Sequence, residues 1–409
     1  MLTTSTIRKN NMLEVFRVIK RKRIVSRPEI AQQTNLTNVT VRKIIGELMK
    51  SNIVMEEGYA KSYGGRKALL YRLNKNACFI IGINMKINSI TIDLFDLEAT
   101  KVFKGNPVCL KDSQSVENTI WTLLRSIHRL IKDTAEKYHH IIGIGVTLPG
   151  RIDHEKGLVS HLTHLDNWVN IPLRDIIEAE TGIPTCIERD TNSHISYLKW
   201  LDITENRPNV VYCSIGEGIG SAVMIEGSVY HGDHGLAGEL GHTTLNPDGP
   251  KCSCGNYGCV ELYTSNKAIL NYYRENLPES GNRISDILGL LQSGNDEADI
   301  IDILAKQALG GDADADRAFA KASGYIGCYI VNIINSYNPS LIILECRWMR
   351  IVGRLFDEIL RKIFESTALI NMNDVKIILN PVEDIFSFAS STIVLEQLFS
   401  KVKNNRLIG

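Results

Sequence analysis

The sequence predicts an α/β protein that begins with a separate, basic helical domain. Residues 1–74 carry fifteen lysines and arginines against five acidic residues, and their apolar positions follow helical spacing. From Cys78 onward, short apolar runs alternate with longer amphipathic segments, which is typical of strands that alternate with helices. We therefore expect a small domain over residues 1–75 and a larger α/β body after it.

Composition excludes several classes of protein. The chain has 409 residues, of which 44% are hydrophobic, so it can form two or three domains with sizeable cores. It has no apolar run long enough to span a membrane, and its first residues do not form an export signal, so we expect a cytoplasmic protein. Nine mostly scattered cysteines do not suggest a secreted disulfide framework.

Charge is unevenly distributed along this neutral chain. Because the first 74 residues are strongly basic and the total charge is zero, the body has a matching acidic excess. A basic segment on an acidic body favours contact between that segment and a polyanion such as DNA. The alternative is a basic face that is merely solvated.

Three helices are expected in the basic domain. The first covers residues 8–20. Ser26 and Glu29 have the spacing of a capping box at the start of a second helix, which ends at residues 34–36. Thr37 can cap a third helix. Its buried stripe, at positions i, i+3, i+4 and i+7, is Val41, Ile44, Ile45 and Leu48.

The exposed face of the third helix carries the residues that we expect to bind DNA. They are Asn38, Val39, Thr40, Arg42 and Lys43. Asparagine and arginine can make bidentate contacts with adenine and guanine, and valine can contact a thymine methyl group. Two short helices joined by a tight turn, with such residues near the start of the second, predict a helix-turn-helix.

Two strands, at residues 53–57 and 68–73, are expected around a loop at residues 58–67. The tip of this loop combines glycines with the cations Arg66 and Lys67, which suits a wing that lies along a phosphate backbone or in a minor groove. Together these features predict a winged helix-turn-helix. The alternative is a three-helix domain with a surface hairpin that binds only protein.

The body contains a cluster of metal-ligand residues. Apolar strands are expected at residues 79–83, 89–95, 141–146, 210–214 and 341–344. Between the last two lie His242, Cys252, Cys254 and Cys259. One imidazole and three thiolates suit a tetrahedral Zn²⁺, and four protein ligands leave no open position, so we expect a structural zinc. Buried unligated cysteines and a redox pair are the alternatives.

Residues 238–261, GELGHTTLNPDGPKCSCGNYGCVE, resemble the signature of the ROK family (repressors, open reading frames and kinases). That signature couples a Gly-Glu-x-Gly-His element to a Cys-x-Cys-Gly-x-x-Gly-Cys zinc loop. The likeness extends over essentially the whole chain, and the N-terminal part is similar to xylose- and N-acetylglucosamine-type repressors. It implies a two-lobed, actin-like sugar-kinase fold with lobes at 76–195 and 196–409. It also implies a homodimer or homotetramer on a palindromic operator.

The same resemblance implies sugar contacts by Asp190, Glu239, His242, Glu261 and Gly150. Carboxylates accept hydrogen bonds from sugar hydroxyls, and zinc would fix the orientation of the His242 imidazole. Asp190 stands where family kinases hold the catalytic base. The usual Asn-Asp pair is here Arg189-Asp190, so the family pattern does not identify the sugar.

The expected phosphate elements depart from the kinase pattern at three places. Residues 84–88 replace the family's Asp-x-Gly-Gly-Thr, residues 216–220 carry a glutamate at position 217, and residues 345–348 lack the usual glycines. We therefore expect no enzyme activity and a sugar-responsive repressor of carbohydrate-utilisation genes. The alternatives are an active sugar kinase with a DNA-binding module and a regulator governed mainly by a protein partner.

Overall fold

The structure, a computed structural model, describes residues 4–61, 67–86, 88–110, 115–162, 165–204, 207–277, 297–366 and 374–400. The chain folds into two compact units. The first unit comprises Met1–Asp202 and Asp384–Gly409, and the second comprises Ile203–Glu383. No helix in the described ranges combines the length and apolar character that a bilayer crossing requires.

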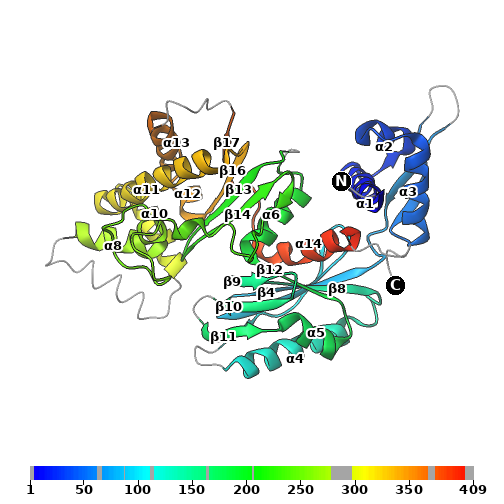
Figure 1. The fold of residues 1–409 in the computed structure, drawn as a ribbon, viewed down its shortest axis with the longest axis horizontal. Helices are drawn as coiled ribbons and strands as arrows, with labels where there is room; N and C mark the ends of the chain where they lie inside the picture. The colour runs from blue at the N-terminus through cyan, green and yellow to red at the C-terminus, as the bar shows by residue number, and fades with distance from the viewer. Residues whose placement is uncertain are drawn as a thin grey trace. The chain divides into compact units, whose positions relative to one another are not determined.

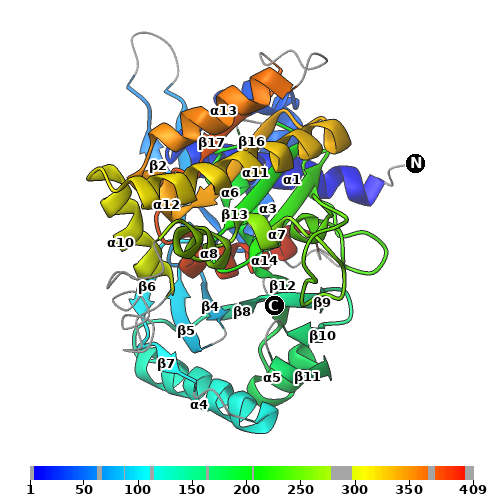
Figure 2. The same cartoon turned by 90° about the vertical axis from the view of Figure 1, so that its left-hand side faces the viewer.

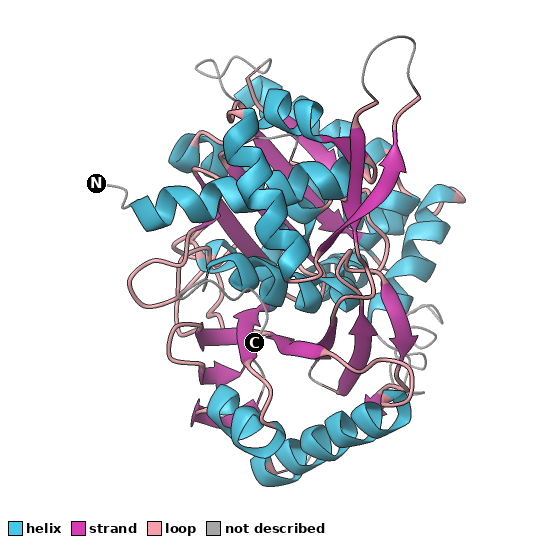
Figure 3. Ribbon diagram, turned by 90° about the vertical axis from the view of Figure 1, so that its right-hand side faces the viewer, coloured by secondary structure: helices cyan, strands magenta, loops and turns pink. Residues whose placement is uncertain are grey.

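Three helices and a small sheet form the N-terminal part of the first unit. The helices are α1 (Thr4–Lys22), α2 (Arg27–Thr34) and α3 (Asn38–Lys50). The antiparallel sheet has the order β1-β3-β2, from β1 (Val25–Ser26), β3 (Leu69–Leu73) and β2 (Val54–Tyr59). Figure 3 shows the helices in cyan against the magenta strands. The three helices and the two hairpin strands confirm the predicted elements, while β1 was not expected.

Local hydrogen bonds explain where the second and third helices begin. The carboxylate of Glu29 accepts hydrogen bonds from the backbone N–H and the hydroxyl of Ser26, at 2.8 and 2.7 Å, before α2. Asn35 ends α2 in the left-handed conformation, with φ of 53°. Thr37 Oγ1 then accepts from the N–H of Thr40 at 3.2 Å and caps α3. The turn between α2 and α3 is therefore encoded locally.

The larger sheet of the first unit has the order β12-β8-β4-β5-β6, and β7 also pairs with β5. Its first three strands are parallel, and β4, β5 and β6 are antiparallel. The bounds are β4 (Phe79–Met85), β5 (Ser89–Phe95), β6 (Lys101–Lys104), β7 (Val108–Cys109), β8 (Ile141–Leu148) and β12 (Thr185–Arg189). A second antiparallel sheet holds β9 (Gly150–Asp153), β10 (Leu158–Leu162) and β11 (Leu165–Ile171).

Helices cover both faces of the larger sheet (Figures 1 and 2). One face packs against α4 (Val116–Thr134) and α5 (Leu173–Thr181), and the other packs against α6 (Asp190–Trp200) and α14 (Ile385–Ser400). Two glycines on the strands lack the Cβ that would otherwise keep α14 away from the sheet. A Cβ at Gly145 would lie 1.9 Å from the carbonyl oxygen of Ser390, and one at Gly82 would lie 2.5 Å from its hydroxyl oxygen.

The position of α14 changes the expected division of the chain. The sequence predicts that residues 196–409 form the second lobe, whereas residues Asp384–Gly409 group with the first unit. The reason is that α14 packs on β4, β8 and α6 rather than on the second sheet.

The second unit is built on a five-stranded sheet with the order β15-β14-β13-β16-β17. Its strands are β13 (Val210–Ile215), β14 (Ile219–Ile225), β15 (Ser228–Val229), β16 (Leu341–Cys346) and β17 (Lys376–Leu379). The helices are α7 (Glu261–Thr264), α8 (Asn266–Asn276), α10 (Glu297–Leu309), α11 (Ala313–Tyr337), α12 (Arg347–Ile351) and α13 (Arg354–Ser366). Figure 2 shows several of them stacked against the sheet, where apolar residues of α11 and β16 share one core.

Candidate metal centre and ligand residues

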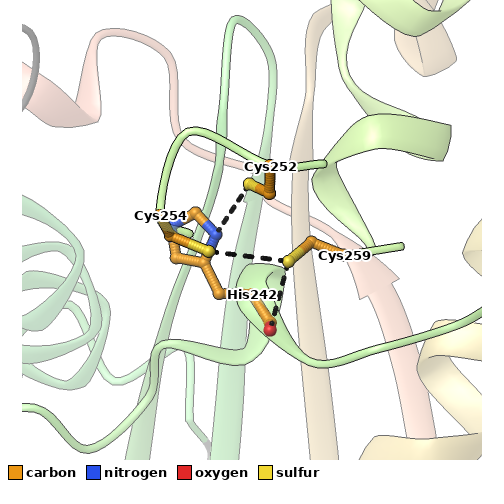
Figure 4. Close-up of side chains that lie close together, drawn as sticks. All are labelled: His242, Cys252, Cys254 and Cys259. Atoms are coloured by element: carbon orange, nitrogen blue, oxygen red, sulfur yellow. Dashed lines mark hydrogen bonds between the residues drawn. The ribbon is translucent and has the colours of Figure 1, made fainter. Parts of the chain in front are cut away.

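The four predicted metal-ligand residues come together in the second unit (Figure 4). His242 ends a short 3₁₀ helix, η1 (Leu240–His242), and the three cysteines lie in the loop that precedes α7. Two isolated β-bridges, Thr244 with Cys259 and Lys251 with Tyr257, close this loop on itself. Segments ten to seventeen residues apart in sequence are thereby held at one point.

The distances suit a tetrahedral ion. Cys252 Sγ lies 3.7 Å from His242 Nδ1, and Cys254 Sγ lies 3.7 Å from Cys259 Sγ. All four potential ligand atoms lie within 4.8 Å of one another. A tetrahedron with Zn–S bonds of about 2.3 Å has S–S edges of about 3.8 Å. The cluster can therefore hold a metal ion with little rearrangement.

The loop around the cluster depends on glycines and on one amide. Gly258 has a φ of +61°, and a Cβ there would lie 1.6 Å from the carbonyl oxygen of Asn246. Asn256 Nδ2 donates to the carbonyl oxygen of His242 at 3.2 Å and contacts the Sγ of Cys259 at 3.5 Å. Such groups orient metal ligands. Asn256 was not among the predicted site residues, although its place within the Gly255–Gly258 segment could have indicated it.

The thiols of the cluster differ in acidity. Burial acts to raise the pKa of Cys254, but hydrogen bonds from the Asn256 backbone and the neighbouring thiols outweigh burial and lower this pKa. Burial and hydrogen bonds with Cys254 and Cys252 raise the pKa of Cys259 to about 12. A bound cation would have to replace the proton of Cys259, so metal binding at this site releases a proton.

Three of the five predicted sugar-binding residues, Glu239, His242 and Glu261, lie in the second unit. Glu239 directly precedes η1, and its carbonyl oxygen accepts from the N–H of His242 at 3.1 Å. Glu261 is the first residue of α7. Its Oε2 accepts, at 3.0 Å, from the backbone N–H of Ile219, the first residue of β14. Glu261 therefore links the metal loop to the second predicted phosphate element.

The other two, Asp190 and Gly150, lie in the first unit. Asp190 is the first residue of α6 and its Oδ1 accepts from the N–H of Thr191 at 2.7 Å. Gly150 opens β9 with a φ of +120°, a conformation that favours glycine. Arg189 is buried, and its guanidinium donates to Asn192 Oδ1 at 3.2 Å. The five residues thus form two groups, one in each unit.

The three predicted phosphate elements have distinct surroundings. Asn84 is buried at the end of β4, and Ile87 of the same element lies outside the described residues. In the β13–β14 turn, a Cβ at Gly218 would lie 2.9 Å from Glu261 Oε2. After β16, Trp348 is fully buried with its ring centroid 5.0 Å from that of Phe319. The carboxylate of Glu261 thus lies close to the second element, and Trp348 of the third element packs into the hydrophobic core.

The residues predicted to contact DNA lie at the start of α3. Asn38, Val39, Arg42 and Lys43 are exposed, and Thr40 is half-buried because of its contact with the cap. Val39 is 66% exposed, so its side chain is accessible to a partner surface. Lys67 is exposed beside β3, and Arg66 lies outside the described residues.

Known proteins resemble this chain over most of its length. The xylose repressor of Bacillus spizizenii is 33% identical over 339 residues, which cover 83% of this chain and 82% of that protein. The DNA-binding transcriptional dual regulator NagC of Escherichia coli is 26% identical over 346 residues, 83% of this chain and 80% of NagC.

Solved structures share the fold. A ROK family transcriptional regulator, a homologue of the E. coli MLC protein, aligns with a TM-score of 0.77 and 24% identity over 96% of this chain and 97% of that chain. The ROK hexokinase of Thermus thermophilus aligns with a TM-score of 0.57 and 22% identity over 78% and 99%. The body therefore has a mixed α/β, sugar-kinase-like fold. The family described as "ROK family" matches residues 80–383, three quarters of the sequence, so the chain belongs to the ROK family.

Proposed function

We propose that this chain is a sugar-responsive, DNA-binding transcriptional regulator that represses carbohydrate-utilisation genes. The observation that carries the proposal is the exposed polar and basic start of α3, on a chain whose body has a sugar-kinase-like fold. Similarity to the xylose repressor and to NagC over more than four fifths of the chain supports it.

We propose that residues 1–75 form a winged helix-turn-helix in which α3 enters the major groove. Asn38 and Arg42 would read base edges, Val39 would contact a thymine methyl group, and the loop between β2 and β3 would contact the backbone. The three-helix arrangement, the Thr37 cap and the exposure of these side chains support this assignment. A homodimer or homotetramer on a palindromic operator would suit paired recognition helices.

We propose sugar contacts by Asp190, Gly150, Glu239, His242 and Glu261, as the resemblance to the family implies. In the metal centre, we propose a structural Zn²⁺ held by His242 and the three cysteines, which fit that ion in number, chemistry and spacing. When bound, zinc would hold the imidazole of His242 in one orientation and stabilise the loop before α7.

We also propose that phosphoryl transfer has been lost. Asn84 offers an uncharged amide oxygen where the family has a carboxylate, so it would bind Mg²⁺ more weakly and neutralise none of its charge. In the turn between β13 and β14, Glu217 adds an exposed carboxylate that would repel a phosphate. The glycine-containing turn, and Asp190 at the position where family kinases hold the catalytic base, are features that favour an active kinase.

Two measurements test the proposal. DNA selected by the full chain from a random duplex pool should contain an inverted repeat, and its affinity should fall with salt. Sugars added to the complex should change that affinity. Isothermal titration with ATP and Mg²⁺ should give no saturable heat, with or without sugar. Saturable ATP binding would favour the kinase, and a failure to select any DNA would contradict the regulator.

A further inference from the structure

Helix α1 of the N-terminal part makes a specific contact with the last residue of α6. The ring centroids of Phe16 and Trp200 lie 5.6 Å apart. The ammonium of Lys20 lies 4.2 Å from the centre of the Trp200 ring and donates a hydrogen bond to the Trp200 carbonyl oxygen. That oxygen is at the C-terminal end of α6, where the helix dipole favours a cation.

The opposite end of α6 begins with Asp190, the residue to which we assign a sugar contact. The helix has eleven residues and is therefore about 15 Å long. Nearly all of its side chains are buried, and it packs on α14 and β12. Burial along its length would make α6 move as one rigid element, so that a displacement at Asp190 would reach Trp200.

Burial at the end of α6 removes the Lys20 ammonium and the Trp200 indole N–H from water without replacing all of their hydrogen bonds. Burial lowers the pKa of Lys20 to about 8, and the nearby Arg17 adds to this effect against the opposing charge of Asp202. Among the described residues, the buried Nε1 of Trp200 has no hydrogen-bond partner. A buried unsatisfied polar group destabilises the arrangement that buries it. The packing of the aromatic rings is therefore partly offset by desolvation, and modest forces can open the contact.

We propose that α6 couples the sugar site to the DNA-binding part of the chain. The contact between Lys20 and Trp200, here called the joint, would be closed when the two side chains touch and open when they separate. Sugar binding at Asp190 would change the balance between these two states. This inference rests on the proposed function. Opening the joint would return the Lys20 ammonium and the indole N–H to water at the expense of ring packing. A sugar that prefers one position of α6 would then change the population of closed joints, and with it the DNA affinity.

Two substitutions in the full chain should move the joint in opposite directions. Lys20→Met removes the desolvated charge and keeps an unbranched chain that packs on the indole, so it favours the closed joint. Trp200→Leu removes the ring and favours the open joint. Arg125→Met is the matched control, because Arg125 lies 5.1 Å from the ring of the exposed Trp121 in the same unit.

The readout is affinity for the selected duplex, with and without sugar. The sugar probes are D-xylose, N-acetylglucosamine and their phosphates. Without sugar, we expect the affinities of the two joint variants to move in opposite directions, each by about threefold or more. The ratio of affinities with and without sugar should approach one in both variants. Arg125→Met should retain both values of the unmodified chain.

Circular dichroism and thermal melting establish that each variant is folded, and Trp200→Phe replaces Trp200→Leu if the latter does not fold. The proposal would be overturned if the folded variants of Lys20 and Trp200 kept the DNA affinity of the unmodified chain and its ratio of affinities with and without sugar. If the unmodified chain itself selects no DNA, or responds to none of the sugar probes, then the proposed function fails and the joint fails with it.

Discussion

Cys254 allows the metal centre to be tested at a single atom. We expect Cys254→Ser to reduce bound zinc from about one ion per chain to well below one, because a serine hydroxyl is a poor ligand for this ion. The melting temperature should fall by several degrees, since the loop before α7 loses its cross-link. Elemental analysis of protein purified without chelators, followed by calorimetry, measures both effects.

Cys328→Ser is the matched control for this substitution. Cys328 is also exposed, but it lies on α11 and does not belong to the cluster. It should leave zinc content and melting temperature unchanged. Unmodified protein that contains no zinc, or a Cys254→Ser variant that retains a full equivalent, would contradict the assignment.

Arg42 provides the corresponding test on the DNA side. Its side chain is exposed on the first turns of α3, so Arg42→Ala should leave the fold intact. Loss of a bidentate contact with guanine should weaken binding to the selected duplex by about 1–3 kcal/mol and relax the preference at one base pair. Lys50→Ala, an exposed change in the last turn of α3, is the control. Equal losses in both variants would indicate non-specific electrostatics instead.

At the scale of residues, local patterns were predictable and through-space partners were not. The cysteines and His242 lie within eighteen positions, so their spacing alone indicated a cluster. The hydrogen bonds of Asn256 and the contact of Glu261 with Ile219 depend on how the loop before α7 folds back. Neither contact produces a repeating pattern in the sequence from which it could be predicted.

Helix α14 depends on two strand glycines for its place on the sheet. We expect Gly145→Ala to destabilise the protein by about 1–3 kcal/mol, because the new Cβ would overlap the Ser390 carbonyl, which lies on helix backbone that cannot turn aside. Gly46→Ala in α3 is the control, since a Cβ at this position would meet no neighbouring atom within 4 Å. It should stabilise by about 0.5–1 kcal/mol through helix propensity. Chemical unfolding followed by circular dichroism gives both values, and equal effects would contradict this account of the packing.

At the scale of elements, the sequence predicted strands and helices better than their grouping. Apolar runs correctly located β4, β5, β8, β13 and β16, because burial on both faces leaves a continuous hydrophobic signal. The association of α14 with the first unit joins it to α6 and β8, which lie far away in the sequence, and no local pattern encodes this pairing. The two-residue strand β1 is too short to produce a periodic signal.

At the scale of the whole molecule, the charge distribution and the proposed function agree. The basic excess of residues 1–74 is concentrated on the part that we assign to DNA, and the acidic body would avoid non-specific binding of its own. We expect the logarithm of DNA affinity to fall linearly with the logarithm of salt concentration. Sugar affinity without DNA should depend little on salt.

If sugar and DNA are coupled through one chain, their effects on each other must be equal. A sugar that weakens DNA binding by a given factor must itself bind more weakly, by the same factor, to the protein–DNA complex. We expect a factor of about 5–150, the usual range for allosteric coupling. Titration of sugar into free protein and into the saturated complex gives one value, and titration of DNA with and without sugar gives the other. Agreement would establish an equilibrium coupling, whereas a change in DNA affinity without the matching change in sugar affinity would indicate a separate process such as altered oligomerisation.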